Sequence, residues 1–228
     1  MLTVKVTGEW KTTYPGAQIG ILEIAGVDNT LKSELIEAEK RAVENRLRER
    51  YAGYSRSNFM ALPVMAAYER YYKRFDKTYH VLLQLESIVL KVKNLPEVSP
   101  LVDANFAAEV DTLVLTASHD ADRLLPPLLI DVSRAGDEFT RMNGAPKQLP
   151  PGDMVMRDNQ GVVCTILYGQ DNISPITVHT THPLYVAYAP PGVGVENVQA
   201  QLDTIEKNIW LFSADCRLVQ KMILSASD

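Results

Sequence analysis

Two neighbouring stretches decide the fold: LPEVSPLVDAN at residues 95–105 and TASHDADRL at residues 116–124. The prolines of the first stretch favour an extended entry before a helix. The second stretch has the polar composition of a turn. We predict that residues 102–120 form a helix and then a short extended segment, with Asn105 and His119 at the rim of one cavity that the later strands close.

Upstream of these stretches the sequence is mainly helical. Alternating residues 2–6 predict a strand, and the apolar run Ile19–Ile24 predicts its neighbour. The polar residues 28–30 are a helix-start signal for a helix over residues 31–50. Further helices are predicted over residues 63–75, which begin with a proline, and over residues 83–92.

Downstream of Pro126-Pro127 the pattern becomes strand-like, with candidate strands at 128–132, 154–156, 162–168 and 184–188. Turn residues 158–161 predict a hairpin between the second and third of these. Apolar residues at helical spacing over 196–212 predict a covering helix. We therefore expect a single α+β domain over residues 1–228: helices first, then a β-sheet or barrel core, covered by a C-terminal helix.

The composition excludes several classes of protein. The N-terminal segment resembles no signal peptide and no stretch is long and apolar enough to span a bilayer, so we expect a cytoplasmic protein without membrane contact. Cys164 and Cys216 lie far apart, which argues against a disulfide framework or a cysteine-ligated metal. We expect no metal and no cofactor. The net charge of −5 argues against a general nucleic-acid binder, and no DNA binding is expected.

The charge is nevertheless unevenly distributed, because residues 46–80 carry a net charge of +5 and contain six of the ten tyrosines. Basic groups interleaved with aromatic ones suit phosphates and unstacked bases. The alternative interpretation is that tyrosines at helical spacing form the core face of a helix whose basic residues are in solvent. The candidate RNA-binding residues are Arg46, Arg48, Arg50, Arg56, Lys73 and Lys77.

Several sparse motifs occur in a fixed order between residues 63 and 189. They include Ala66-Ala67-Tyr68, Leu101-Val102-Asp103, Gly136-Asp137-Glu138, Pro151-Gly152-Asp153 and Thr180-Thr181. In order and spacing the chain resembles a stand-alone copy of the editing module, the B3/B4 domain, of the phenylalanyl-tRNA synthetase beta subunit. Nothing in it resembles an ATP-binding site, so it is not a synthetase by itself.

The resemblance implies a pocket for the aminoacylated end of tRNA, in which the wrong amino acid is hydrolysed from its ester. It places the family's pocket Thr on Asn105, its Asn on Phe106, its His on Ala117 and its tyrosine-sensing acid on Val186. Most of the family's editing groups are therefore replaced. The candidate pocket residues are Asp103, Asn105, His119, Asp120 and Thr180.

Two hypotheses follow. The first is an RNA-binding hydrolase that binds charged tRNA and deacylates it. The second is a non-catalytic module that holds an amino acid, another small ligand or a protein partner in the same pocket. A metal-dependent site at His119-Asp120-Ala121-Asp122 would need further ligands that the sequence does not supply, and Asp120 is predicted to cap the following turn.

Overall fold

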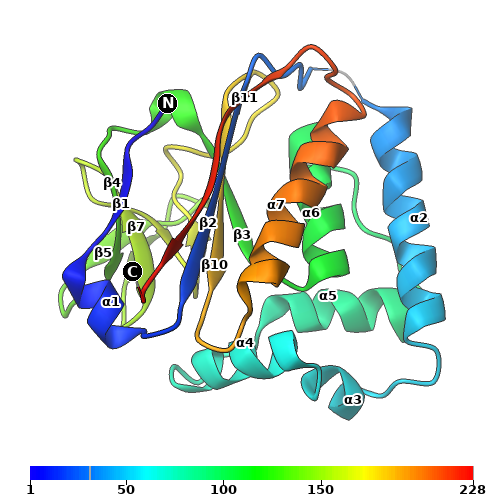
Figure 1. Cartoon of the computed structure of the whole chain (residues 1–228), viewed down its shortest axis with the longest axis horizontal. Coiled ribbons are helices and arrows are strands. Elements are labelled where there is room, and N and C mark those ends of the chain that lie inside the picture. The colour runs from blue at the N-terminus through cyan, green and yellow to red at the C-terminus, as the bar shows by residue number, and fades with distance from the viewer. Residues whose placement is uncertain (31, 228) are drawn as a thin grey trace.

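A four-stranded antiparallel sheet runs through the middle of the molecule, in the order β11-β2-β10-β3. Its strands are β2 (Gln18–Ala25), β3 (Thr116–Asp120), β10 (Pro183–Ala189) and β11 (Arg217–Ser225). Figure 1 shows this sheet between a second sheet on one side and helices on the other. The structure is a computed structural model, and it describes residues 1–30 and 32–227.

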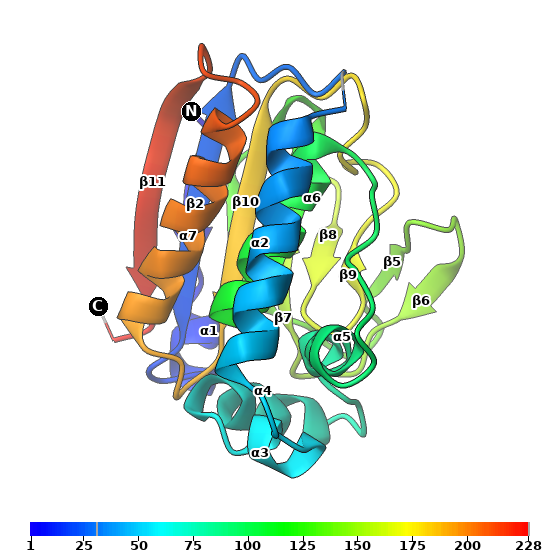
Figure 2. The ribbon, with the colours of Figure 1, turned by 90° about the vertical axis from the view of Figure 1, so that its right-hand side faces the viewer.

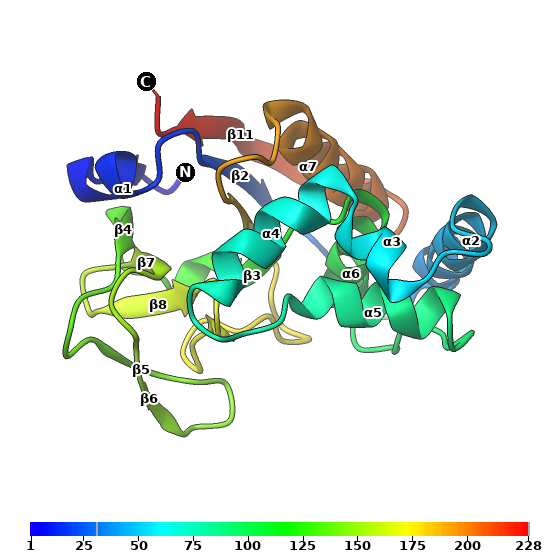
Figure 3. The same cartoon turned by 90° about the horizontal axis from the view of Figure 1, so that it is seen from below.

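The second sheet has five strands in the order β1-β4-β7-β8-β9. Only β1 and β4 are parallel; the other neighbours are antiparallel. The strands are β1 (Val4–Val6), β4 (Leu128–Val132), β7 (Met154–Arg157), β8 (Val162–Thr165) and β9 (Gly169–Gln170). A separate hairpin of β5 (Glu138–Thr140) and β6 (Pro146–Gln148) extends away from it (Figure 3).

The helices form two groups. Helices α6 (Pro100–Thr112) and α7 (Val195–Trp210) pack together beside the four-stranded sheet, and α2 (Glu34–Arg50) packs on α6 (Figure 2). Helices α3 (Arg56–Met60), α4 (Pro63–Lys73) and α5 (His80–Val89) lie at one end of the molecule (Figures 1 and 3). None of the described helices is long and apolar enough to cross a bilayer.

The α+β class and a helix after most of the strands are confirmed, with two open sheets in place of a barrel. Residues 100–120 form a helix and then a strand, as predicted, and the β7–β8 hairpin turns at residues 158–161. Strand β11 was not predicted. It is an edge strand whose side chains are exposed or half-buried, so it lacks a clear apolar pattern.

The expected pairing of the first two strands is wrong, because β1 pairs with β4 and β2 pairs with β10 and β11. Between them lies a short helix, α1 (Gly8–Thr13), which the sequence analysis did not predict. The Thr7 hydroxyl caps this helix by accepting from the Trp10 amide at 3.1 Å, and the Trp10 side chain is buried. The buried tryptophan anchors α1 and separates the two strands into different sheets.

Two helix starts differ from the prediction. Ser33 caps α2 through the Ile36 amide, whereas the Asp28 carboxylate accepts from the Thr30 amide in a local turn. Leu31, where the helix was predicted to begin, lies outside the described residues. Helix α5 begins and ends three residues earlier than predicted. Its end precedes Val92, whose positive φ of 52° ends the helical backbone.

Close packing fixes α7 on the central sheet. A Cβ atom built on Gly20 of β2 would lie 2.6 Å from Val198 Cγ1 and 3.2 Å from Leu202 Cδ1, both on α7. Only glycine permits this approach without displacing the stiff valine side chain. The helix therefore sits directly on the strand that pairs with β10, one of the strands that contribute to the cavity described next.

Candidate functional site

A cavity of about 440 Å³ lies between α6, α5 and the strands β3 and β8. Most of its wall is apolar and includes Val102, Phe106, Leu115, Ile166 and Ile176. Its exposed residues, which form the mouth, are His80, Val98, Met142 and Gly169. A cavity of this size with an apolar wall and few polar groups is typical of a small-molecule site.

Glu109 is the carboxylate of the cavity wall. Its Oε1 accepts a hydrogen bond from the Thr116 amide at 2.9 Å, which links α6 to the start of β3. Burial raises the pKa of Glu109 to about 8. The side chain is therefore mainly a neutral acid at pH 7.

Asn105 also lines the cavity, and its amide is used to hold the fold. Asn105 Nδ2 donates to the Thr116 carbonyl at 3.0 Å, and Gln201 Nε2 of α7 lies 3.4 Å from Asn105 Oδ1. The same Gln201 nitrogen donates to Thr116 Oγ1 at 2.9 Å. The Asn105 side chain thus connects α6, β3 and α7.

Two buried polar atoms of the wall, the Tyr188 hydroxyl and Gln84 Oε1, have no nitrogen or oxygen hydrogen-bond partner within the described part of the chain. The Cys164 thiol, a weak hydrogen-bonding group, lies beside the Tyr188 hydroxyl. Ser118 also lines the cavity. Tyr188 is almost completely buried, and a buried hydroxyl without a partner is destabilising. A ligand in the cavity would supply the missing hydrogen bonds. Cys164 lies on the same wall, and burial raises the pKa of its thiol to about 12, so it is not a nucleophile at neutral pH.

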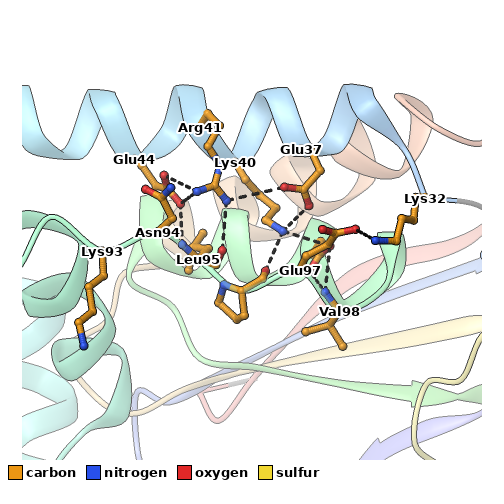
Figure 4. A network of polar contacts seen from close by, with 12 residues as sticks. Lys32, Glu37, Lys40, Arg41, Glu44, Lys93, Asn94, Leu95, Glu97 and Val98 are labelled. Carbon is orange, nitrogen blue, oxygen red and sulfur yellow. Dashed lines mark hydrogen bonds and ion pairs between the residues drawn. The ribbon is translucent and has the colours of Figure 1, made fainter.

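Asp103 lies outside this cavity, in a polar network that joins α2 to residues 95–98. Figure 4 shows Glu37 and Lys40 of α2 beside Leu95 and Val98 in this network. Asp103 Oδ2 is 3.1 Å from Nζ of Lys40, a fully buried lysine of α2, and Asp103 Oδ1 accepts from the Val98 amide at 3.1 Å. Lys40 Nζ also donates to the Pro96 carbonyl at 2.7 Å and to Glu37 at 2.5 Å. Asp103 therefore holds the segment whose Val98 reaches the cavity mouth.

His119 is fully buried and does not line the cavity. Its Nδ1 is 2.7 Å from Ser174 Oγ, and that hydroxyl donates to Asp171 Oδ1 at 2.7 Å. Because the serine proton goes to Asp171, His119 Nδ1 is the donor and cannot activate the serine. Burial lowers the pKa of His119 to about 3. The predicted sharing of one cavity rim by Asn105 and His119 is wrong.

Asp120 and Thr180 contact each other but not the cavity. Thr180 Oγ1 donates to Asp120 Oδ2 at 2.9 Å. Asp120 Oδ1 accepts from the Asp122 amide at 3.2 Å and caps the 3₁₀ turn over residues 121–123, as predicted. The structure thus brings only Asn105 of the five candidate pocket residues to the cavity. Of the positions placed by resemblance, Asn105, Phe106 and Ala117 line it and Val186 does not.

Most of the candidate RNA-binding residues are engaged with carboxylates. The pairs are Arg46 with Glu39 and Asp111, Arg48 with Glu44, Arg50 with Asp111, Arg56 with Glu86, and Lys73 with Glu69. Lys77 is the exception among the six: no carboxylate of the described residues pairs with it, and its Nζ lies 5.7 Å from the Tyr168 ring centre. Lys147 Nζ lies 4.8 Å from the same ring.

The tyrosines of this region are core residues, which confirms the alternative interpretation for them. Five of the six are buried: Tyr51, Tyr68, Tyr71, Tyr72 and Tyr79. The hydroxyls of Tyr68 and Tyr72 donate to backbone carbonyls in β10 and after β8, at 2.7 and 2.8 Å. The rings of Tyr68, Tyr71 and Tyr72 hold α4 against the sheets, and none of the five buried rings is available for stacking on bases.

Sequence reasoning did not single out Glu109, Gln84 or Tyr188 as site residues. Glu109 could have been found, because it follows Asn105 by four residues and therefore shares its helix face, among the apolar residues Phe106, Ala108 and Val110. An acid in such a run is unusual unless it has a role. No comparable local signal marks Tyr188, which looks like any other aromatic residue in a strand.

Three comparisons place the chain among known proteins. Residues 65–208 match the family described as the B3/4 domain. Comparison with curated proteins gives no significant match. Among solved structures, the chain is similar to an N-terminal fragment of the phenylalanyl-tRNA synthetase beta subunit from Pyrococcus horikoshii, with a TM-score of 0.51 and 10% sequence identity. That likeness covers 97% of this chain and 50% of the fragment, and at this identity it shows the fold alone.

Proposed function

Because the chain belongs to the B3/4 domain family, we propose that its cavity binds the aminoacyl end of a charged tRNA and promotes hydrolysis of the ester. The observation that carries this proposal is the cavity itself: about 440 Å³, apolar, and lined by hydroxyl and amide groups without partners. The solved structure that the chain resembles comes from a tRNA synthetase subunit, which supports the choice of substrate.

Hydrolysis requires a water molecule near the ester carbonyl and donors for the oxygen on which negative charge develops. Tyr188 and Ser118 line the cavity, and their hydroxyls can serve as these donors. The apolar wall of Val102, Phe106 and Ile166 suits a small or apolar side chain. Val186 is not part of this wall, so it does not determine whether tyrosine is accepted.

The first test removes one hydroxyl from the cavity. We expect Tyr188→Phe to slow deacylation at least about tenfold over a panel of aminoacylated tRNAs, since one oxyanion donor contributes on the order of 10²–10³ in rate. Stability should be equal to or greater than that of the parent, because the buried hydroxyl has only the weak Cys164 thiol as a partner in the folded chain. Deacylation time courses and urea unfolding measure the two effects.

Tyr185→Phe is the matched control. Tyr185 lies on the same strand, outside the cavity wall, and its hydroxyl donates to the Leu101 carbonyl at 2.9 Å. This variant should lose about 1 kcal/mol of stability and keep the parent deacylation rate. Equal rates in both variants and the parent would contradict the assignment of Tyr188.

The alternative is a non-catalytic module that holds an aminoacyl group or amino acid. It is favoured by the engagement of Asn105 in the fold and by the low pKa of His119, because neither side chain is then a base for water at neutral pH. Saturable binding of a ligand without release from any ester in the panel would select this alternative.

A second test concerns RNA contact. Lys77 and Lys147 both lie near the ring of Tyr168, the residue before Gly169 of the cavity mouth, and both lack a carboxylate partner within the described residues. We expect Lys77→Glu with Lys147→Glu to weaken tRNA binding and to reduce the slope of log affinity against log salt by about 2. Arg46→Glu with Arg50→Glu is the control on paired residues and should have the smaller effect. A larger loss of affinity in the Arg46/Arg50 variant than in the Lys77/Lys147 variant would contradict this assignment and place the RNA on α2.

A further inference from the structure

The charge of the cavity wall restricts what the cavity can bind. Glu109 is the only carboxylate among the described wall residues, and none of them is a lysine or arginine. Oε1 of Glu109 is occupied by the Thr116 amide, whereas Oε2 has no partner in the described chain. The cavity therefore offers one free acidic oxygen and no permanent cation.

This arrangement treats three classes of ligand differently. A free carboxylate or phosphate inside the cavity would be buried without a cation and close to an acid, which is unfavourable. An uncharged ligand would gain only apolar and hydrogen-bonding contacts. A ligand with an ammonium group would gain a charge-assisted hydrogen bond to Glu109 in a largely apolar site, where such bonds are strong.

We propose that Glu109 binds the ammonium group of the ligand, so that the cavity accepts a primary amine on an apolar body and rejects the free amino acid. This inference rests on the proposed function and deepens it. The group recognised would be the α-ammonium of an aminoacyl ester, whose carboxyl carries no charge while it is esterified. The free amino acid released by hydrolysis would gain a carboxylate and be expelled.

Recognition of an ammonium group by Glu109 must be coupled to the loss of a proton from the Glu109 carboxyl. The carboxyl is mainly protonated at pH 7, because burial raises its pKa to about 8. It must lose this proton to pair with an ammonium ion. The other titratable groups around it are His80 on α5, Cys164 on β8, Tyr188 on β10, and Tyr68, Tyr72 and Tyr79 on and after α4. Of these, only His80 can become positively charged, and that charge would also repel an ammonium ion at low pH.

The test uses calorimetry with three probes that share one apolar body: 3-methylbutylamine, its N-acetyl derivative and free leucine. The amine remains protonated to about pH 10, as a lysine side chain does. We expect it to bind about a hundredfold more weakly at pH 6 than at pH 9, in proportion to the ionised fraction of Glu109. At pH 7, heats in two buffers should show nearly one proton released per amine bound. The acetamide should show no pH dependence, and leucine should bind at least about tenfold more weakly than the amine at pH 9.

Glu109→Gln retains an acceptor for the Thr116 amide and removes the titration. It should abolish both the proton release and the pH dependence. Asp153→Asn is the matched control, since Asp153 is a buried acid outside the cavity wall and should leave both unchanged. A pH dependence that persists in Glu109→Gln would assign the effect to His80 and overturn the proposal. The proposal would also be overturned if the amine did not bind at pH 9, or if leucine bound as tightly as the amine.

The two proposals fail separately. If the amine fails these tests while Tyr188→Phe still slows deacylation, the cavity remains the site of hydrolysis and only the role of Glu109 is lost. If the parent protein neither deacylates any ester nor binds any of the three probes, the proposed function is lost as well.

Discussion

Lys40→Met is expected to lower the free energy of unfolding by roughly 3–5 kcal/mol, which is the usual effect of removing one partner of a buried ion pair. Lys40 is fully buried, and its Nζ contacts Glu37 (Figure 4), the Pro96 carbonyl and Asp103. Burial already raises the pKa of Asp103, and Lys40 opposes that rise. Without the lysine, the aspartate and the carbonyl would be left buried without their partner. Urea unfolding followed by circular dichroism measures the loss.

Lys32→Met is the matched control, because Lys32 pairs with Glu97 in the same network at 2.5 Å but is 86% exposed. An exposed pair contributes about 0–1 kcal/mol. The double variant Lys40→Met with Asp103→Asn should recover part of the loss, since it removes the unpaired charge. Equal losses for Lys32→Met and Lys40→Met would contradict the assignment of Lys40 as the buried centre of the network.

Stability should fall as the pH rises from 5.5 to 8.5. Burial raises the pKa of Glu109 to about 8 and that of Asp153 to about 7, well above the values of an unfolded chain. Between the unfolded and folded pKa values the folded chain holds more protons, so stability is greatest at the acidic end and is lost as each folded pKa is passed. At about 1.4 kcal/mol per unit, Glu109 contributes a loss of roughly 3 kcal/mol and Asp153 roughly 2 kcal/mol over this range. His119, whose pKa burial lowers to about 3, contributes an opposite gain of roughly 1 kcal/mol as the pH rises past the unfolded histidine pKa, so the net change is still a loss.

Unfolding free energies from urea titrations at pH 5.5, 7.0 and 8.5 measure this dependence. The range begins at pH 5.5 to stay above the carboxylates whose pKa is lowered, such as Glu23 and Asp131. Glu109→Gln should reduce the total loss of stability between pH 5.5 and 8.5 by roughly 3 kcal/mol. Asp131→Asn is the control, because the Asp131 carboxylate is already ionised over the whole range. It should leave the change of unfolding free energy with pH unaltered. A Glu109→Gln slope equal to that of the parent would show that this acid is not buried as described.

Local patterns predicted local structure well. Helix α4 begins at the predicted Pro63, and α7 lies within two residues of the predicted range, because helical spacing and proline positions are properties of neighbouring residues. Strand pairing depends on distant residues. Nothing near Val4 indicates that its partner strand begins at Leu128, so the pairing of β1 could not be inferred from periodicity.

The candidate site shows the same contrast between local features, which the sequence predicts, and long-range contacts, which it does not. The sequence located the helix-strand unit that forms the cavity and predicted Asn105 within it. The direction of His119 depends on which side of β3 meets residue 174, which lies 55 residues later. Some partners of the basic residues are also distant in the sequence, since Asp111 and Glu86 come from other helices. An arginine that binds RNA and one that binds a distant carboxylate look alike in the sequence.

Strand β11 has a consequence for the order in which the chain can fold during synthesis. Its partner β2 is the first strand of that sheet to be made, whereas β11 emerges after every other strand of it. Until then β2 can pair with β10 on one side only, and its other edge presents unpaired backbone amides and carbonyls to neighbouring nascent chains. Ribosomes that stall before Arg217 would release chains with this edge open, which makes them candidates for aggregation or for capture by chaperones.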